Sequence, residues 1–218
     1  KNKFIAQRGL HKSIIIPENS IQAFKKAKGK NYAIEFDINI TIDNQIVIFH
    51  DDDLNRLCNK KERIEEVTYD FLKDLKLYES DEKIPLLKEL LVEISGKIPL
   101  VIEIKKHKNI GILENKLVDL LENYKGKYLI CSFEKDILFW FKKNKPNLKR
   151  GLIFESNPKK FEKYNKTLFL YKYYKSRADF ISLDYKLLDS SIYDFCVKNS
   201  LDLITWTIRN KENFEKVK

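Results

Sequence analysis

Short apolar runs alternate with segments of helical spacing along most of the chain, and this alternation constrains the fold more than any other feature. The runs 100–105 and 180–185 are rich in Leu, Ile, Val and Phe. Between two such runs, Leu113, Leu117 and Leu121 recur at the spacing of one helical face. Strands that alternate with helices form βα units around a parallel sheet. The sequence therefore predicts an α/β fold.

The number of predicted strands indicates a barrel. The predicted parallel strands are 4–7, 33–40, 100–105, 128–133, 151–155, 180–185 and 203–208, and the predicted helices are 21–27, 113–123, 135–143 and 190–199. A closed barrel of βα units has eight parallel strands. The chain ends at Lys218, inside a helical pattern that follows the seventh strand. We expect a (β/α)8 TIM-type barrel, formed by residues 1–218 as a single domain, whose closing eighth strand is missing from this sequence.

One segment interrupts the βα rhythm. A turn at 41–44 separates the strand 33–40 from a second extended run that ends at His50. A tight turn joins antiparallel neighbours, so this hairpin is expected to bring His50 near Asp37. Residues 51–95 then read as short helices and loops, with helical spacing over 63–77 and 86–94. We interpret them as a small helical insertion in the barrel.

Composition narrows the class of protein. No apolar run approaches the roughly 18 residues that a membrane helix needs, so we expect no transmembrane segment. The net charge of +10 fits an anionic partner or a merely lysine-rich composition. We favour the second reading and expect no nucleic-acid partner, because no long block of like charges occurs. Three distant cysteines predict reduced thiols and a cytoplasmic location, although a chain that starts at Lys1 leaves an upstream signal open.

Polar side chains gather where predicted strands end. Glu35 and Asp37 are two residues apart, so both carboxylates face the same side of a strand. Glu103 and Lys105 end another strand, and Arg8 follows the first one. Active sites of such barrels lie at the carboxyl ends of the strands. Three carboxylates suit Mg²⁺ or Ca²⁺, and the two cations suit a phosphate.

Each of these motifs also has a purely structural explanation. Glu35 and Asp37 fit carboxylates that form salt bridges with other residues or lie on an edge strand, and Glu103 with Lys105 fits a strand that emerges into water. His50 and the three acidic residues after it fit the first turn of a helix. Their joint occurrence favours a functional site.

Eight motifs, spread from the first predicted strand to the last, resemble those of the glycerophosphodiester phosphodiesterase family. The match is most specific in the first third of the chain, and residues 110–200 match only in rhythm. The motifs are Ile5-Ala-Gln-Arg-Gly9, Pro17-Glu-Asn-Ser20, Ile34-Glu-Phe-Asp37, Ile46-Val-Ile-Phe-His-Asp51, Leu54-Asn-Arg56, Ile84-Pro-Leu-Leu87, Ile102-Glu-Ile-Lys105 and Trp206-Thr207.

The resemblance implies metal-dependent hydrolysis of a small-molecule glycerophosphodiester to glycerol phosphate and an alcohol, as part of lipid and glycerol metabolism. The roles it implies are these: Glu35, Asp37 and Glu103 bind the divalent metal, Mg²⁺ or Ca²⁺; Arg8 and Lys105 hold the phosphate; His50 is one catalytic histidine; and Trp206 lines the substrate-facing wall. For Trp206, core packing is an equally good explanation.

One position departs from the family pattern. The family motif begins Ala-His-Arg-Gly, whereas this chain has Gln7 at the position of the first catalytic histidine. A glutamine amide forms hydrogen bonds but does not transfer protons near pH 7. His11 is the candidate substitute, but we interpret it as an additional loop residue, and we expect His107 at the surface.

Three explanations of Gln7 stay open: an engineered substitution that traps a ligand, a natural protein that binds phosphodiesters without cleaving them, or a slow enzyme that uses His50 alone. The alternative functions are accordingly a catalytically impaired or inactive phosphodiester-binding domain, or a relative that acts on lysophospholipids or on a glycerophosphate polymer. Nucleic-acid binding, suggested by charge alone, ranks below both.

Overall fold

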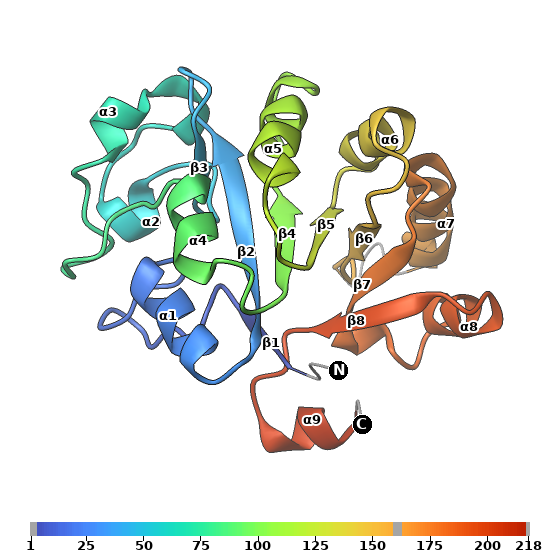
Figure 1. Cartoon of the computed structure of the whole chain (residues 1–218). Coiled ribbons are helices and arrows are strands. Elements are labelled where there is room, and N and C mark those ends of the chain that lie inside the picture. Colours follow the sequence, from blue (N-terminus) through green and yellow to red (C-terminus); the bar gives the residue numbers. More distant parts are fainter. Residues whose placement is uncertain (1–3, 159–162, 217–218) are drawn as a thin grey trace. The chain divides into compact units, whose positions relative to one another are not determined.

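The computed structural model describes residues 4–158 and 163–216. Contacts between residues divide the chain into two compact units, Lys1–Leu129 and Ile130–Lys218, and each unit has its own sheet strands and its own hydrophobic core. Figure 1 labels the helices and strands. Among the described residues, seven strands run parallel to a neighbour and one is antiparallel, as the sequence predicts.

The strands of the first unit place its acidic residues in register. They are β1 (Ile5–Gln7), β2 (Ala33–Ile40), β3 (Ile46–Ile48) and β4 (Leu100–Ile104). β2 lies between β1 and β4 and is parallel to both. In this register Gln7 lies beside Glu35, and Asp37 beside Glu103. β3 is antiparallel to β2, which confirms the predicted hairpin, and the backbone N–H of Phe49 donates to the Asp37 carbonyl at 3.0 Å.

Two helices of the first unit pack together beside β2. α1 (Ile21–Gly29) begins where predicted, because the Ser20 hydroxyl accepts a hydrogen bond from the Ala23 N–H and so caps the helix. α4 (Leu87–Ile94) contacts α1, and α5 (Ile112–Glu122) follows β4.

Short helices fill the segment between β3 and α4. They are α2 (Asn55–Cys58), the 3-10 helix η1 (Ile64–Glu66) and α3 (Tyr69–Leu72). They surround a hydrophobic cluster separate from the core of the second unit, made of Val47, Phe49, Leu54, Leu57, Ile64, Leu72, Leu77, Ile84 and Leu86. The continuous helical spacing over 63–77 is therefore realised only as short turns. The extended backbone of Val67 ends the first turn, and Thr68 caps the next.

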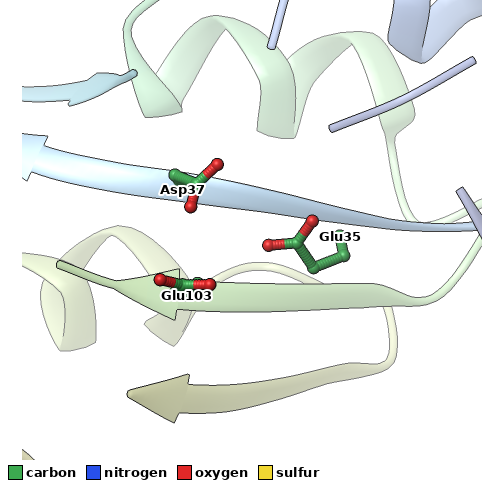
Figure 2. Close-up of side chains that lie close together, drawn as sticks. All are labelled: Glu35, Asp37 and Glu103. Carbon is green, nitrogen blue, oxygen red and sulfur yellow. The ribbon is translucent and has the colours of Figure 1, made fainter. Parts of the chain in front are cut away.

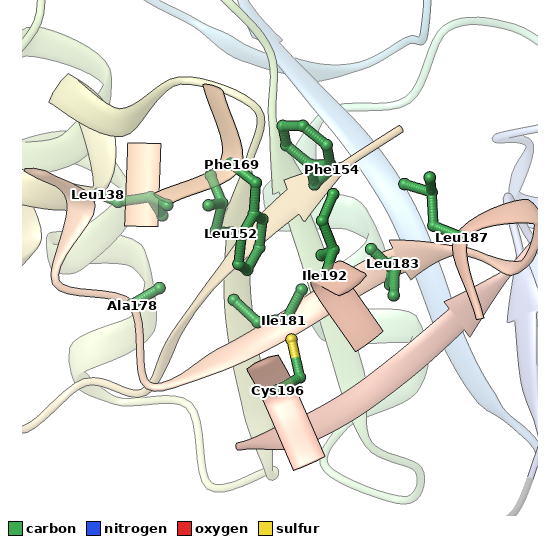
Figure 3. Close-up of a cluster of buried hydrophobic side chains, with 10 residues drawn as sticks. All are labelled: Leu138, Leu152, Phe154, Phe169, Ala178, Ile181, Leu183, Leu187, Ile192 and Cys196. Carbon is green, nitrogen blue, oxygen red and sulfur yellow. The ribbon is translucent and has the colours of Figure 1, made fainter. Parts of the chain in front are cut away.

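The second unit repeats the βα pattern. Its parallel strands are β6 (Arg150–Phe154), β7 (Phe180–Asp184), β8 (Asp202–Trp206) and, from Ile130 on, β5 (Tyr128–Ser132). Its helices are α6 (Lys135–Asn144), α7 (Asn165–Ser176), η3 (Tyr185–Leu187), α8 (Ser191–Lys198) and α9 (Lys211–Lys216). Figure 3 shows its core, in which Phe154 and Phe169 pack edge to face with ring centroids 5.3 Å apart. Cys196 belongs to this core, as a buried thiol.

Sequence patterns do not predict α7. Its twelve residues include four aromatic ones, and only Asn165, Phe169 and Ser176 are buried, so that it has little amphipathic contrast. Among the described residues, no side chain caps its N-terminus. Within 4–158 and 163–216, no helix combines the length and the apolar character needed to cross a membrane.

His107 is not at the surface, and this prediction is wrong. Its side chain is 1% exposed, and its Nε2 lies 3.1 Å from Oε1 of Glu114, which is fully buried. Its Nδ1 lies 2.9 Å from the carbonyl oxygen of Lys105. Glu114 also accepts from the N–H of Gly111 and so holds the start of α5. The local pattern suggests a surface loop after β4, but α5 folds back and covers the imidazole.

We expect the free energy of unfolding to fall as the pH rises above about 6.5, partly because of His107. Burial lowers the pKa of this imidazole, but the hydrogen bonds with Glu114 and the Lys105 carbonyl outweigh burial and raise its pKa above the usual 6.5. A raised histidine pKa stabilises the fold fully below the unfolded-state pKa, and this contribution is lost as the pH passes the folded-state pKa. Urea unfolding at a series of pH values measures the slope. The slope should shrink in His107→Gln and persist in His11→Gln, which changes an exposed histidine.

Candidate active site

Three carboxylates from two adjacent strands meet in the first unit. Glu35 and Asp37 lie on β2 and Glu103 on β4, and Figure 2 shows the three side chains beside one another. One oxygen of each lies within 4.8 Å of the others. Asp37 is 1% exposed and Glu103 8% exposed. Three carboxylates this close and this buried repel one another unless cations balance them.

Two side-chain cations border the carboxylates. Arg8 Nε lies 3.3 Å from Asp37 Oδ2, and Lys105 Nζ lies 2.8 Å from Glu103 Oε1 and 3.6 Å from Asp37 Oδ1. The backbone N–H of Arg8 donates to Glu35 Oε2 at 3.1 Å. Arg8 and Lys105 are the residues that the sequence assigned to phosphate, and both lie at the edge of the cluster.

The backbone at Arg8 explains the glycine that follows it. Arg8 has a φ of 53° and Gly9 a φ of 79°, both in the left-handed region. A side chain on Gly9 would come within 2.8 Å of Ala23 on α1. The turn after β1 therefore needs glycine here, and the turn directs the Arg8 N–H toward Glu35.

The pKa values record how crowded the carboxylates are. Burial raises the pKa of Glu35 well above its usual range, and the charges of Asp37 and Glu103 raise it further. Burial and Asp37 also raise the pKa of Glu103. Burial lowers the pKa of Lys105, but the charges of Glu103 and Asp37 outweigh it, so the net shift is upward. The site favours extra positive charge.

The three carboxylates fit a divalent cation. Glu35 Oε1 and Asp37 Oδ1 are buried and accept no hydrogen bond from the residues that the structure describes. Mg²⁺ and Ca²⁺ take oxygen ligands at about 2.0–2.6 Å. Ligand oxygens on opposite sides of such an ion are at most about 5 Å apart, which agrees with the cluster. Buried carboxylate oxygens that accept no hydrogen bond and lie within this distance of one another suit a hard cation such as Mg²⁺ or Ca²⁺.

His50 follows β3 and is oriented by its neighbour. Its Nδ1 lies 2.6 Å from Oδ1 of Asp51, and its side chain is 30% exposed. Burial raises the pKa of Asp51, but the hydrogen bonds with His50 and Arg56 outweigh burial and hold the pKa far below its usual range. Asp51 is therefore an ionised acceptor, and the His50 proton that it binds is on Nδ1. This leaves Nε2 available to exchange a proton with a substrate.

The two remaining predicted site residues lie on different units. Gln7 ends β1, half-buried and in register with Glu35, so the structure brings it beside the carboxylates. Trp206 ends β8 in the second unit and is half-buried, with its ring 6.0 Å from that of Phe133. Its Nε1 is buried and has no hydrogen-bond partner within the described part of the chain.

Sequence reasoning missed Asn19, because its place directly before Ser20 and the helix suggests no more than a helix cap. The Asn19 side chain donates to Asp37 Oδ2 at 2.9 Å, and the cap is Ser20. Asn19 is 1% exposed and has a φ of 57°. A cap assignment rests on neighbouring residues alone, whereas the partner of Asn19 is eighteen residues away.

Known proteins resemble this chain over nearly its whole length. A family model described as the glycerophosphoryl diester phosphodiesterase family matches residues 8–218. A glycerophosphodiester phosphodiesterase of Caldanaerobacter subterraneus subsp. tengcongensis is 32% identical, over 100% of this chain and 90% of that protein. Another, from Bacillus altitudinis, is 30% identical over 69% of this chain and 66% of that protein.

Solved structures support the fold. A phosphodiesterase of Oleispira antarctica, solved with the product sn-glycerol-3-phosphate, has a TM-score of 0.84 at 21% identity and covers 98% of this chain and 87% of its own. A glycerophosphodiester phosphodiesterase of Thermotoga maritima has a TM-score of 0.75 at 24% identity, with 98% and 89% covered. The prediction of a TIM-type α/β barrel is thereby confirmed. The chain belongs to the glycerophosphodiester phosphodiesterase family of phosphoric diester hydrolases.

Proposed function

We propose that this chain hydrolyses glycerophosphodiesters to glycerol phosphate and an alcohol with the help of a divalent cation, Mg²⁺ or Ca²⁺. The observation that carries the proposal is the juxtaposition of three carboxylates with Arg8 and Lys105. The relative of 32% identity is named as a glycerophosphodiester phosphodiesterase, and the Oleispira phosphodiesterase was solved with sn-glycerol-3-phosphate as its product.

Each residue of the site has a separate task in this proposal. Glu35, Asp37 and Glu103 hold the cation, which when bound stabilises negative charge on the phosphate. Arg8 and Lys105 neutralise phosphate oxygens and orient the diester. His50 exchanges a proton at Nε2 with the attacking or the leaving oxygen. Gln7 donates or accepts a hydrogen bond at the phosphate but moves no proton.

The role of Trp206 as a substrate contact stays a prediction from the family resemblance. A broad apolar groove near Trp206 would favour a lysophospholipid substrate, and an open polar groove would favour a glycerophosphate polymer. A cytoplasmic location stays a prediction.

A second candidate function is binding of phosphodiesters without cleavage, and Gln7 is the observation that favours it. Release of glycerol phosphate from glycerophosphodiesters with different headgroups distinguishes the two, with calorimetry of the same compounds for binding. We expect product from the parent chain, and a loss of about 10²–10⁴-fold in His50→Ala. If the chain binds these glycerophosphodiesters tightly but forms no product from any of them, binding without cleavage replaces the proposal of hydrolysis.

A further inference from the structure

A continuous chain of charged contacts joins the proposed phosphate-binding arginine to the proposed catalytic histidine. Arg8 Nη1 donates to Glu18 Oε1 at 2.9 Å, and Arg56 Nη2 donates to the same oxygen at 2.6 Å. Arg56 also donates to Asp51, from Nε at 2.7 Å and from Nη2 at 3.1 Å. Asp51 in turn binds His50 at 2.6 Å. We call Glu18, Arg56 and Asp51 the bridging residues.

The bridging residues come from separate parts of the first unit. Glu18 precedes α1, Asp51 follows β3, and Arg56 lies on the one-turn helix α2. The Arg56 guanidinium faces Asp51 with two N–H groups, one for each carboxylate oxygen, which fixes the plane of the carboxylate as well as its position. Burial raises the pKa of Glu18, but its contacts with Arg56 and Arg8 outweigh burial and lower the pKa. Glu18 is therefore the shared anion between two arginines.

Fold stability alone is a poor explanation for Arg56. Its side chain is 42% exposed, and that of Asp51 is 22% exposed. Ion pairs of exposed side chains add little to the stability of a fold. Orientation is a better explanation, because Asp51 holds the His50 proton on Nδ1 only while the carboxylate keeps its place.

We propose that Glu18 and Arg56 are positioning residues of the hydrolase site. Arg56 fixes Asp51 and thereby the ring of His50, and Glu18 ties Arg56 to Arg8. The positions of the Arg8 guanidinium, which holds the phosphate, and of the His50 imidazole, which transfers the proton, are then fixed relative to each other. The inference rests on the proposed roles of Arg8 and His50, and it adds two residues that lie outside the carboxylate cluster and act through Arg8 and Asp51.

The first test reads the His50 ring directly, without substrate. The chain has three histidines, so ¹⁵N spectra of the imidazole rings are simple, and His50→Ala assigns the His50 signals. At a pH high enough for neutral imidazole, we expect the His50 proton of the parent on Nδ1, where Asp51 accepts it. In Arg56→Met the signals should move toward a mixture of both tautomers. Arg63→Met is the matched control, because Arg63 forms a comparable exposed ion pair, with Asp52 at 3.4 Å.

The second test is kinetic and uses the Gln7→His background if the parent is slow. We expect Arg56→Met to lower kcat by about 10- to 100-fold, the range typical of residues that orient a site from behind, with little change in Tm. Arg56→Lys should recover only part of kcat, because an ammonium lacks the two-pronged contact. Glu18→Gln should chiefly raise KM, because it loosens Arg8.

The inference is overturned if the His50 signals and kcat of Arg56→Met both match those of Arg63→Met, or if Arg56→Lys restores kcat completely. Failure of the proposed function looks different: no product forms in either background. The ring spectra still decide whether Arg56 positions His50.

Discussion

Replacing Gln7 with histidine is expected to raise kcat for glycerophosphodiester hydrolysis by about 10²–10⁴-fold, the usual contribution of one general acid or base. Gln7 ends β1 in register with Glu35 and directly precedes Arg8. An imidazole at this position would lie beside the carboxylates and the proposed phosphate site. It would exchange a proton near pH 7, which the glutamine amide does not do. Initial rates at saturating substrate, measured across pH 5–9, compare the two chains.

The pH profile identifies the cause of any gain. The added histidine should give kcat of Gln7→His a second pH dependence, which kcat of the parent lacks. Gln22→His is the control, because it adds a histidine on an exposed position of α1. A parent that already turns over within about tenfold of Gln7→His, and loses activity in His50→Ala, would show that hydrolysis here needs one histidine. Hydrolysis through His50 alone would then replace binding without cleavage as the explanation of Gln7.

The sequence predicts those parts of the fold that local periodicity specifies. The βα rhythm locates all seven parallel strands, and the turn after Ile40 gives the hairpin that carries His50. The alternation of Glu35 and Asp37 on β2 predicts a shared face, and the structure places both within reach of Glu103. These features depend on residues close in sequence, or on the rule that parallel strands end at one edge.

Features set by distant contacts are beyond such patterns. α7 has no capping side chain and little amphipathic contrast, so its helical state depends on packing in the core of the second unit. The burial of His107 depends on α5 folding over it. Glu18 and Arg56 are 38 residues apart in sequence, and only the fold brings them together. The sequence shows both residues in family-like motifs but gives neither a partner.

A chelator is expected to abolish release of glycerol phosphate, and excess Mg²⁺ or Ca²⁺ is expected to restore it. The same ions should raise Tm, because a ligand that binds only the folded state stabilises it by about 2.7 kcal/mol at 100 times its Kd. Initial rates and thermal unfolding, each measured with chelator and with added ion, test both effects. Activity that persists in chelator, or a Tm that does not change when Mg²⁺ or Ca²⁺ is added, would contradict a metal site at the three carboxylates.

Glu35→Gln sharpens this test because its two effects on stability have opposite signs. Without metal, the buried carboxylates repel one another, and burial with Asp37 and Glu103 raises the pKa of Glu35. Neutralising Glu35 removes that repulsion, so the variant should unfold at a higher temperature than the parent in chelator. With metal, the variant lacks one ligand, so its Tm should rise less than the Tm of the parent. The Tm advantage of the variant should therefore shrink or reverse. Glu79→Gln, at an exposed position, should follow the parent in both conditions. Equal metal-induced shifts in Glu35→Gln and Glu79→Gln would place the cation away from β2.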